Sequence, residues 1–181
     1  TDPKIPRQPL PASDGTDYLK TIPGFSAVRN GGTNGDPVLR GMFGSRLNIL
    51  TDGTSMPGAC PARMDAPSSY ISPENFDKLT VIKGPQTVLW GPGASAGTIK
   101  FDRDTPRLTE AGARFDGSLQ GGSTGRNDQA ADLTVGNDKV YTRFTANHSH
   151  SLDYKDGDGN TVPSRCDKCN ADVALGFTPD A

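Results

Sequence analysis

The chain has little sulfur, little charge imbalance and no long apolar run. Its 181 residues include three Cys and three Met, and 19 Lys and Arg nearly balance 21 Asp and Glu, for a net charge of −2. This weak negative charge argues against a nucleic-acid partner, because non-specific binding of a polyanion requires a cationic field. No apolar run approaches the roughly 20 residues of a membrane-spanning helix, so any membrane crossing must use strands. No basic start precedes an apolar stretch, so we expect any signal peptide to be absent or already removed.

Acid–base machinery is equally scarce. The two His, His148 and His150, lie in one segment, "NHSHS", and no Ser-His-Asp set is suggested. The glycine-rich "GPGASAG" of residues 91–97 leads into a strand-like segment and not into a helix, so it fails as a nucleotide-binding fingerprint. We therefore do not expect an enzyme.

The three cysteines divide into a close pair and a single residue. Cys166 and Cys169 form "CDKC", whereas Cys60 lies about a hundred residues earlier. In an oxidising compartment we expect the pair to form a disulfide, with a surface metal-capture pair as the alternative. A second Cys-x-x-Cys is missing, so a closed structural zinc site is not expected.

Residues 1–104 alternate short helical and short extended pieces among turns, in a chain with 22 Gly and 15 Pro. Residues 1–13 are proline-rich and predict an extended lead-in. A short helix should follow, capped by Ser13 or Asp14 and stopped by Pro23-Gly24. Strands are expected at residues 25–30, 36–42, 46–53, 79–84 and 98–101. Ser72 should cap a second helical turn that begins at Pro73. The first part is thus predicted as an α+β domain, a small mixed sheet with short helices.

Residues 105–181 follow a different pattern, a strict alternation of apolar and polar residues. It recurs in four segments, at residues 114–122, 128–136, 140–147 and 172–177. Such a period of two predicts antiparallel strands with one apolar and one polar face. A tight turn and a long polar loop alternate between them, as in outer-membrane barrels, although a soluble β-meander shares the alternation. Four strands cannot close a barrel, which needs roughly eight, so the barrel is expected to be incomplete and the chain cut short.

Several separated motifs then resemble one family. They are a helix ending Ile-Pro-Gly, a Pro-x-x-Arg-Gly strand, a strand ending Asp-Gly, and a Lys-Gly-Pro…Trp-Gly-x-Gly…Gly-x-Ile run. In this order they resemble the plug domain of TonB-dependent outer-membrane receptors, over residues 14 to 104. The resemblance implies a plug inside a barrel of roughly 22 strands. It also implies the bacterial outer membrane as location, its lipid as surroundings, and energy from the TonB complex of the inner membrane.

Within that family, "GACPARMDAPSSYISPE" resembles the copper-receptor branch, whose plug carries a Cys-x-x-x-Met motif. The resemblance places this motif on Cys60 and Met64 and implies copper as the transported ligand. Further ligands in that branch come from barrel segments that these residues do not include. The N-terminal box that contacts TonB has no clear match.

The residues themselves support the same chemistry. Thiolate and thioether are soft donors that favour Cu(I) over hard cations. Pro61 suits a first helical position, which would make Cys60 a cap and bring Met64 one turn later onto the same side. Met56 is a weaker candidate for another sulfur ligand. His148 and His150 are weaker candidates as well, because the alternation places both on the outward face with Phe144 and Ala146.

Two alternatives remain open from sequence. Cys60 and Met64 could be core packing in a receptor for a metal chelate or another small ligand, since both residue types are common in interiors. The second alternative is a soluble, secreted metal-binding or adhesive β-protein.

Overall fold

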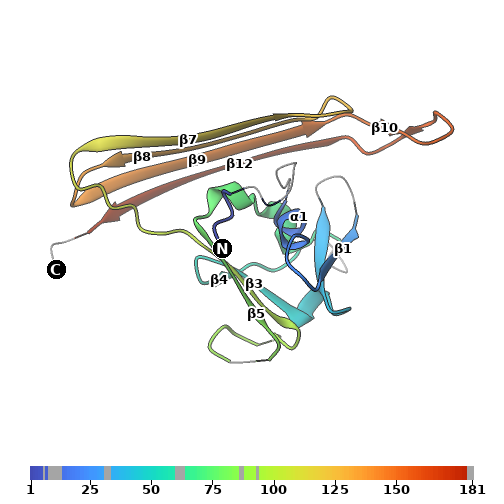
Figure 1. Cartoon of the computed structure of the whole chain (residues 1–181), viewed down its shortest axis with the longest axis horizontal. Helices are drawn as coiled ribbons and strands as arrows, with labels where there is room; N and C mark the ends of the chain where they lie inside the picture. The colour runs from blue at the N-terminus through green and yellow to red at the C-terminus, as the bar shows by residue number, and fades with distance from the viewer. Residues whose placement is uncertain are drawn as a thin grey trace. The chain divides into compact units, whose positions relative to one another are not determined.

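The computed structural model describes residues 1–5, 7, 14–30, 34–59, 64–85, 88–92 and 94–178 (Figure 1). It divides into two compact units, Thr1–Arg103 and Asp104–Ala181. Among the described residues, no helix is long and apolar enough to cross a membrane.

The first unit contains two sheets. Strands β1 (Phe25–Arg29) and β2 (Gly35–Leu39) form an antiparallel hairpin. The second sheet has the order β4-β3-β6-β5 and is mixed, because β3 and β6 run parallel while the other pairs are antiparallel. Its strands are β3 (Leu47–Thr51), β4 (Thr54–Ser55), β5 (Lys78–Lys83) and β6 (Gly97–Asp102). This mixed sheet confirms the predicted fold class.

Residues at their own ends account for the short helices of the first unit. Helix α1 (Gly15–Leu19) is capped by Asp14, whose carboxylate accepts a hydrogen bond from the Asp17 amide at 2.8 Å. Single 3₁₀ turns follow at η1 (Gly44–Arg46), η3 (Pro67–Tyr70) and η4 (Pro73–Asn75). Pro73 begins η4 as expected, but Ser72 makes no side-chain capping bond, which corrects the predicted cap. Ser13 lies outside the described residues.

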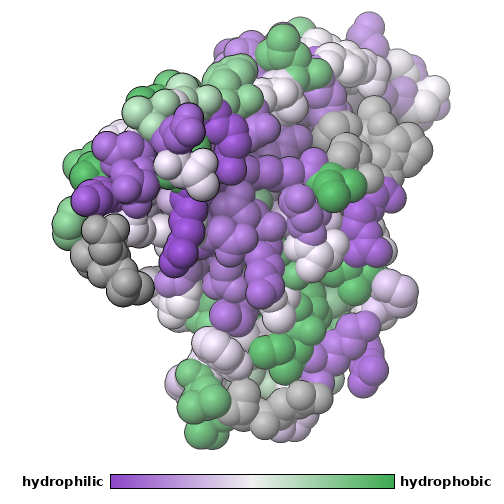
Figure 2. All heavy atoms as spheres, turned by 60° about the vertical axis from the view of Figure 1, so that its left-hand side comes forward, coloured by the Kyte–Doolittle hydropathy of each residue, from purple (hydrophilic) through white to green (hydrophobic). Residues whose placement is uncertain are grey.

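A single apolar core holds the first unit together. Its fully buried members include Leu19 from α1, Leu39 from β2, and Ile99 and Phe101 from β6. The rings of Phe76 and Phe101 lie 5.5 Å apart between centroids. Figure 2 colours one face of the molecule by hydropathy and shows hydrophobic residues in separate patches among hydrophilic ones. The mixed sheet therefore gives the loops around it a rigid base.

The second unit is a sheet of four long antiparallel strands, which lie side by side in Figure 1 in the order β12-β9-β8-β7. They are β7 (Gly112–Gly121), β8 (Asn127–Gly136), β9 (Val140–Ser151) and β12 (Cys166–Phe177), of 10 to 12 residues each. A small hairpin of β10 (Tyr154–Lys155) and β11 (Thr161–Val162) joins β9 to β12. These lengths match the roughly 9–11 residues of a membrane-crossing strand.

The strand β12 begins six residues earlier than the alternation predicts. Its pairing with β9 continues up to Cys166 opposite Ser151, so Cys166 and Cys169 lie in a strand and not in a loop. The two residues remain separate thiols, which corrects the predicted disulfide. Three steps along a strand place them on opposite faces, with Cα atoms about 10 Å apart at roughly 3.3 Å per residue. A disulfide requires less than about 7 Å.

The faces of this sheet are the reverse of those in a water-soluble protein. Large apolar side chains on one face are exposed, as shown by Phe115 at 67% and Leu175 at 78%. The opposite face carries buried polar groups, where Arg143 pairs with Asp132 at 2.6 Å and is 3% exposed. An apolar outside and a polar inside are the pattern of an outer-membrane barrel wall.

Candidate functional site

The loop between Ala59 and Asp65 is closed by the backbone at its two ends. The amide of Ala59 donates to the Asp65 carbonyl at 3.0 Å, and the amide of Asp65 donates to the Ala59 carbonyl at 3.3 Å. The two residues thus form an isolated antiparallel bridge, in which paired Cα atoms lie roughly 4.5–5.5 Å apart. Ala59 and Asp65 consequently lie side by side.

Side-chain amides from the β1–β2 hairpin hold the returning end of this loop. Asn34 lies just before β2 and donates from Nδ2 to the Met64 carbonyl at 2.9 Å and to Asp65 Oδ1 at 3.0 Å. Asn30 follows β1 and donates to the same Met64 carbonyl at 3.3 Å. Ser69 in η3 donates from Oγ to Asn34 Oδ1 at 2.7 Å and thereby sets the orientation of the carboxamide. The main chain of Met64 is therefore fixed from two sides.

The side chain of Met64, in contrast, is not packed. It is 55% exposed, which argues against the alternative that this residue fills the core. Cys60 lies outside the described residues, and so does most of the expected helix from Cys60 to Met64; Met64 itself is in a bend. Met56 is half-buried, directly after β4, with its amide 3.3 Å from the Ile49 carbonyl. The structure thus presents one thioether at the surface next to a closed loop.

The donors around Met64 suit a soft ion better than a hard one. Asp65 accepts from Asn34, and the Tyr70 hydroxyl lies 3.4 Å from its Oδ2, so its carboxylate already has protein donors. Among the described residues no group of three His, Cys, Asp or Glu is arranged to hold a metal ion. The thioether of Met64 is the donor type that Cu(I) prefers.

His148 and His150 lie on the outward face of β9 and are engaged with a neighbouring strand. Nε2 of His148 lies 3.1 Å from Asp167 Oδ1, and Nδ1 of His150 lies 3.1 Å from Asp167 Oδ2. One carboxylate of β12 thus bridges both imidazoles. The arrangement joins two strands and engages one ring nitrogen of each histidine.

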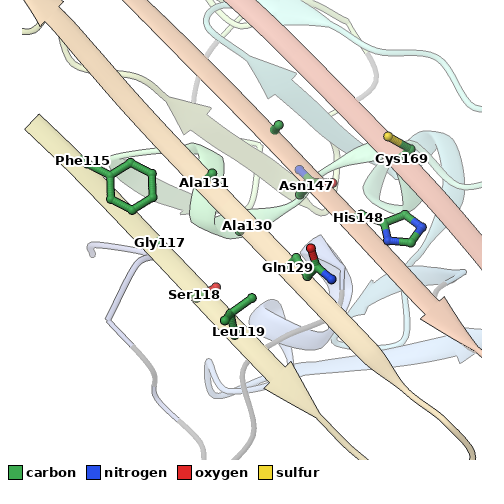
Figure 3. A pocket seen from close by; sticks show the side chains of 11 residues that line it. Phe115, Gly117, Ser118, Leu119, Gln129, Ala130, Ala131, Asn147, His148 and Cys169 are labelled. Atoms are coloured by element: carbon green, nitrogen blue, oxygen red, sulfur yellow. The ribbon is translucent and has the colours of Figure 1, made fainter.

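The outward face also has a hollow of about 480 Å³ across the four strands (Figure 3). Small residues pair straight across its floor, with Gly117 opposite Ala131 and Ala131 opposite Ala146. Phe115 and Leu119 of β7 stand on either side of Gly117, and His148 and Cys169 lie toward the other end. The lining is mostly apolar, so the hollow belongs to the apolar face and does not resemble a metal centre.

The network around Met64 could not be recognised along the sequence. Asn30 and Asn34 belong to the turn cluster "RNGGTNGD", where Asn is expected for turn formation alone. Their bonds to Met64 span 34 and 30 residues. Only the fold brings the hairpin, η3 and the loop together.

Comparison with known proteins places this geometry in a family. A family model described as the TonB-dependent Receptor Plug Domain matches residues 2–98. The solved structure of the Copper transporter OprC is 70% identical, with a TM-score of 0.95, over 99% of this chain and 28% of that one. The Hemin receptor of Yersinia enterocolitica is 30% identical over 92 residues, which make up 50% of this chain and 13% of that protein.

The FrpB iron transporter from Neisseria meningitidis (F3-3 variant) is 21% identical with a TM-score of 0.69, over 92% of this chain and 27% of that one, and shares the fold alone. The chain thus spans well under a third of each relative named here. The family is one of receptors and transporters and not an enzyme class. Because the family model covers more than half of its residues, the chain belongs to the TonB-dependent receptors of the bacterial outer membrane, and carries their plug domain.

Proposed function

We propose that this chain forms the plug and the first barrel strands of a receptor that captures copper outside the cell and imports it into the periplasm. In this proposal residues 1–104 are the plug, with residues 1–13 as lead-in, and residues 105–181 begin the barrel. Its main support is the 70% identity to the Copper transporter OprC over 99% of the chain. The closed loop that ends at an exposed Met64 supports it independently.

Cys60 and Met64 are the proposed copper ligands. In the sequence they directly follow Ala59 and directly precede Asp65, the two residues that form the antiparallel bridge. A thiolate and a thioether provide a soft pair of donors suited to Cu(I). This pair needs no carboxylate ligand, and Asp65 already accepts a hydrogen bond from Asn34.

Transport would proceed in two stages. An exposed thioether lets copper enter the site without prior unfolding of the plug. Energy delivered by the TonB complex would then rearrange the plug, separate the two sulfurs and release the ion toward the periplasm. The outer-membrane lipid is the proposed surroundings of the apolar face of β7, β8, β9 and β12, and no nucleic-acid partner is proposed.

A receptor for a metal chelate or another small ligand is the second candidate. It is favoured by the relatives whose names refer to hemin and to iron. In that case Cys60 and Met64 would be structural, which the 55% exposure of Met64 does not favour. The alternative of a soluble secreted β-protein is set aside by the family match.

A Cu(I) competition titration against a colorimetric chelator tests the proposal. Cys60→Ala and Met64→Ala should each lower the Cu(I) affinity by at least about tenfold, because even residues that only orient metal ligands are worth roughly 10–100-fold. Cys169→Ala removes an exposed thiol elsewhere and should leave the affinity unchanged. Equal affinities in wild type, Cys60→Ala and Met64→Ala would refute the ligand assignment.

A further inference from the structure

The Asn34 side chain connects three separate segments at the base of the Met64 loop. Its amide nitrogen bonds the Met64 carbonyl at 2.9 Å and Asp65 Oδ1 at 3.0 Å, and its oxygen accepts from Ser69 Oγ at 2.7 Å. A carboxamide has two N–H donors and one oxygen acceptor. Here both donors and the acceptor are used, so the side chain is held in a single orientation.

Among the residues that the structure describes, no comparable contact holds the Met64 side chain. With 55% of the residue exposed, packing does not fix the thioether, and its position depends on where the main chain is placed. That main chain is fixed on one side by the Ala59–Asp65 bridge and on the other by the carboxamides of Asn34 and Asn30. The hydrogen bond to the Met64 carbonyl from Asn34 is shorter than that from Asn30. Asn34 also donates to the carboxylate of Asp65.

We propose that Asn34 is a positioning residue for the copper site, which sets the place of the Met64 thioether through the Met64 carbonyl and the Asp65 carboxylate. This inference rests on the proposed function, because it assumes that Cys60 and Met64 bind Cu(I). Asn34 does not bind copper itself. It acts as the hydrogen-bonding partners of ligands do in other metal sites, where their loss weakens metal binding although every ligand remains.

Asn34→Asp is the sharpest variant, because it preserves size and an acceptor for Ser69 while removing both donors. It also places a carboxylate 3.0 Å or so from Asp65. Asn34→Ala removes all three bonds without adding charge. Both variants should weaken Cu(I) binding by about tenfold or more, the usual effect of losing an orienting partner. Asn30→Ala removes only the 3.3 Å bond and should have a smaller effect.

A double-mutant cycle separates positioning from general destabilisation. If Asn34 acts through Met64, Asn34→Ala should cause no further loss of affinity in a Met64→Ala background. X-ray absorption at the copper edge should also show fewer sulfur ligands per copper in Asn34→Ala than in the wild type. Asn48→Ala is the matched control, because Asn48 likewise donates from its carboxamide to a distant backbone carbonyl, that of Trp90.

The outcomes distinguish this inference from the proposed function. If Cys60→Ala and Met64→Ala weaken binding but Asn34→Ala and Asn34→Asp do not, the positioning role is wrong and the ligand assignment stands. An equal loss from Asn34→Ala with and without Met64, or an equal loss in Asn48→Ala, also overturns the positioning role. If Cys60→Ala and Met64→Ala bind copper as the wild type does, the proposed function itself fails.

Discussion

Met64 combines a fixed main chain with an accessible side chain, a combination that suits a residue that captures and then releases an ion. Its carbonyl accepts from Asn34 at 2.9 Å and from Asn30 at 3.3 Å, whereas its side chain remains at the surface. A buried thioether would be better positioned but could exchange copper only after local unfolding. Hydrogen bonds to the backbone therefore supply the order that packing would supply in a core, and they leave the side chain exposed.

Gly97 fixes another local geometry, in the centre of the mixed sheet. A Cβ at this position would lie 2.5 Å from the backbone carbonyl oxygen of Ile82 in β5 and 3.2 Å from Leu39. A backbone atom cannot move aside as a flexible side chain can, so β6 would have to shift away from β5. We expect Gly97→Ala to lower the free energy of unfolding by about 1–3 kcal/mol, the usual cost of overpacking.

Chemical denaturation of the protein measures this effect. Gly112→Ala provides the comparison, because the nearest atom to its added Cβ is the Glu110 carbonyl oxygen at 3.9 Å. If both alanine variants unfold at the same denaturant concentration, the close approach of β5 and β6 at Gly97 does not limit the side chain there.

At the scale of elements, the hairpin between β9 and β12 is held by two aspartates. Asp153 accepts hydrogen bonds from the amides of Ser164 and Arg165, each at 2.7 Å. Asp156 accepts from the Asn160 amide at 2.8 Å. The bond from Ser164 is the main cause of a lowered pKa for Asp153, and that from Asn160 is the main cause for Asp156.

These shifts fix the direction of a pH dependence. A pKa that is lower in the folded loop means that the ionised carboxylate stabilises the loop. That stabilisation is complete above the ordinary pKa of 3.8 and is lost as the pH falls through the lowered pKa values. We therefore expect the loop to keep its order in mildly acidic medium and to lose it only below that ordinary value.

Amide chemical shifts of Ser164 and Arg165 in an acid titration measure the transition. In Asp153→Asn the shifts of these two amides should show no acid transition, because the uncharged amide oxygen of asparagine accepts their hydrogen bonds at every pH. Asp138→Asn, in the turn before β9, should leave the titration of both amides intact. A wild-type transition centred above the ordinary aspartate pKa would contradict the assignment.

The limits of sequence-based prediction also follow from particular elements. The alternation locates β9 and the final residues of β12, because apolar side chains such as Phe144 and Val173 face outward there. It fails before Ala171, where the outward positions carry Cys169 and Asp167 although the strand pairing continues. The alternation of apolar and polar residues depends on which side chains face an apolar environment. Pairing between strands, in contrast, requires only backbone hydrogen bonds. The predicted start of β12 is therefore late.

In the candidate site, local features can be predicted from the sequence and long-range contacts cannot. The Cys-x-x-x-Met motif is local, so the sequence and the family resemblance suffice to propose Cys60 and Met64. The contacts of Asn34 with Met64 and Ser69 depend on the packing of a hairpin against two loops, across 30 and 35 residues. No propensity or periodicity encodes such a contact, and only the three-dimensional structure identifies it.

At the scale of the whole molecule, the two units bury their side chains by opposite rules. The first unit encloses a core of apolar residues, including Leu39, Ile99 and Phe101 at 0% exposure. The second exposes its apolar residues and buries an ion pair, Arg143 with Asp132. In water this second arrangement would be unfavourable, because apolar area is exposed and charges are desolvated. It is favourable where lipid lies against one face.

Phe115 lies on the apolar face, in a row that pairs Phe115 with Leu133 and Leu133 with Phe144, so it tests this rule directly. An arginine there would have to place its charge in hydrocarbon. We expect Phe115→Arg to lower the free energy of unfolding in a lipid bilayer by about 2–4 kcal/mol, the cost reported for arginine near the bilayer midplane. Gln120→Arg adds the same charge to the polar face of the same strand and should cost far less. Denaturant titration of both variants in bilayers measures the difference. Since the two variants share a strand and differ in the face that receives the charge, equal stability would mean that the exposed apolar face does not meet lipid.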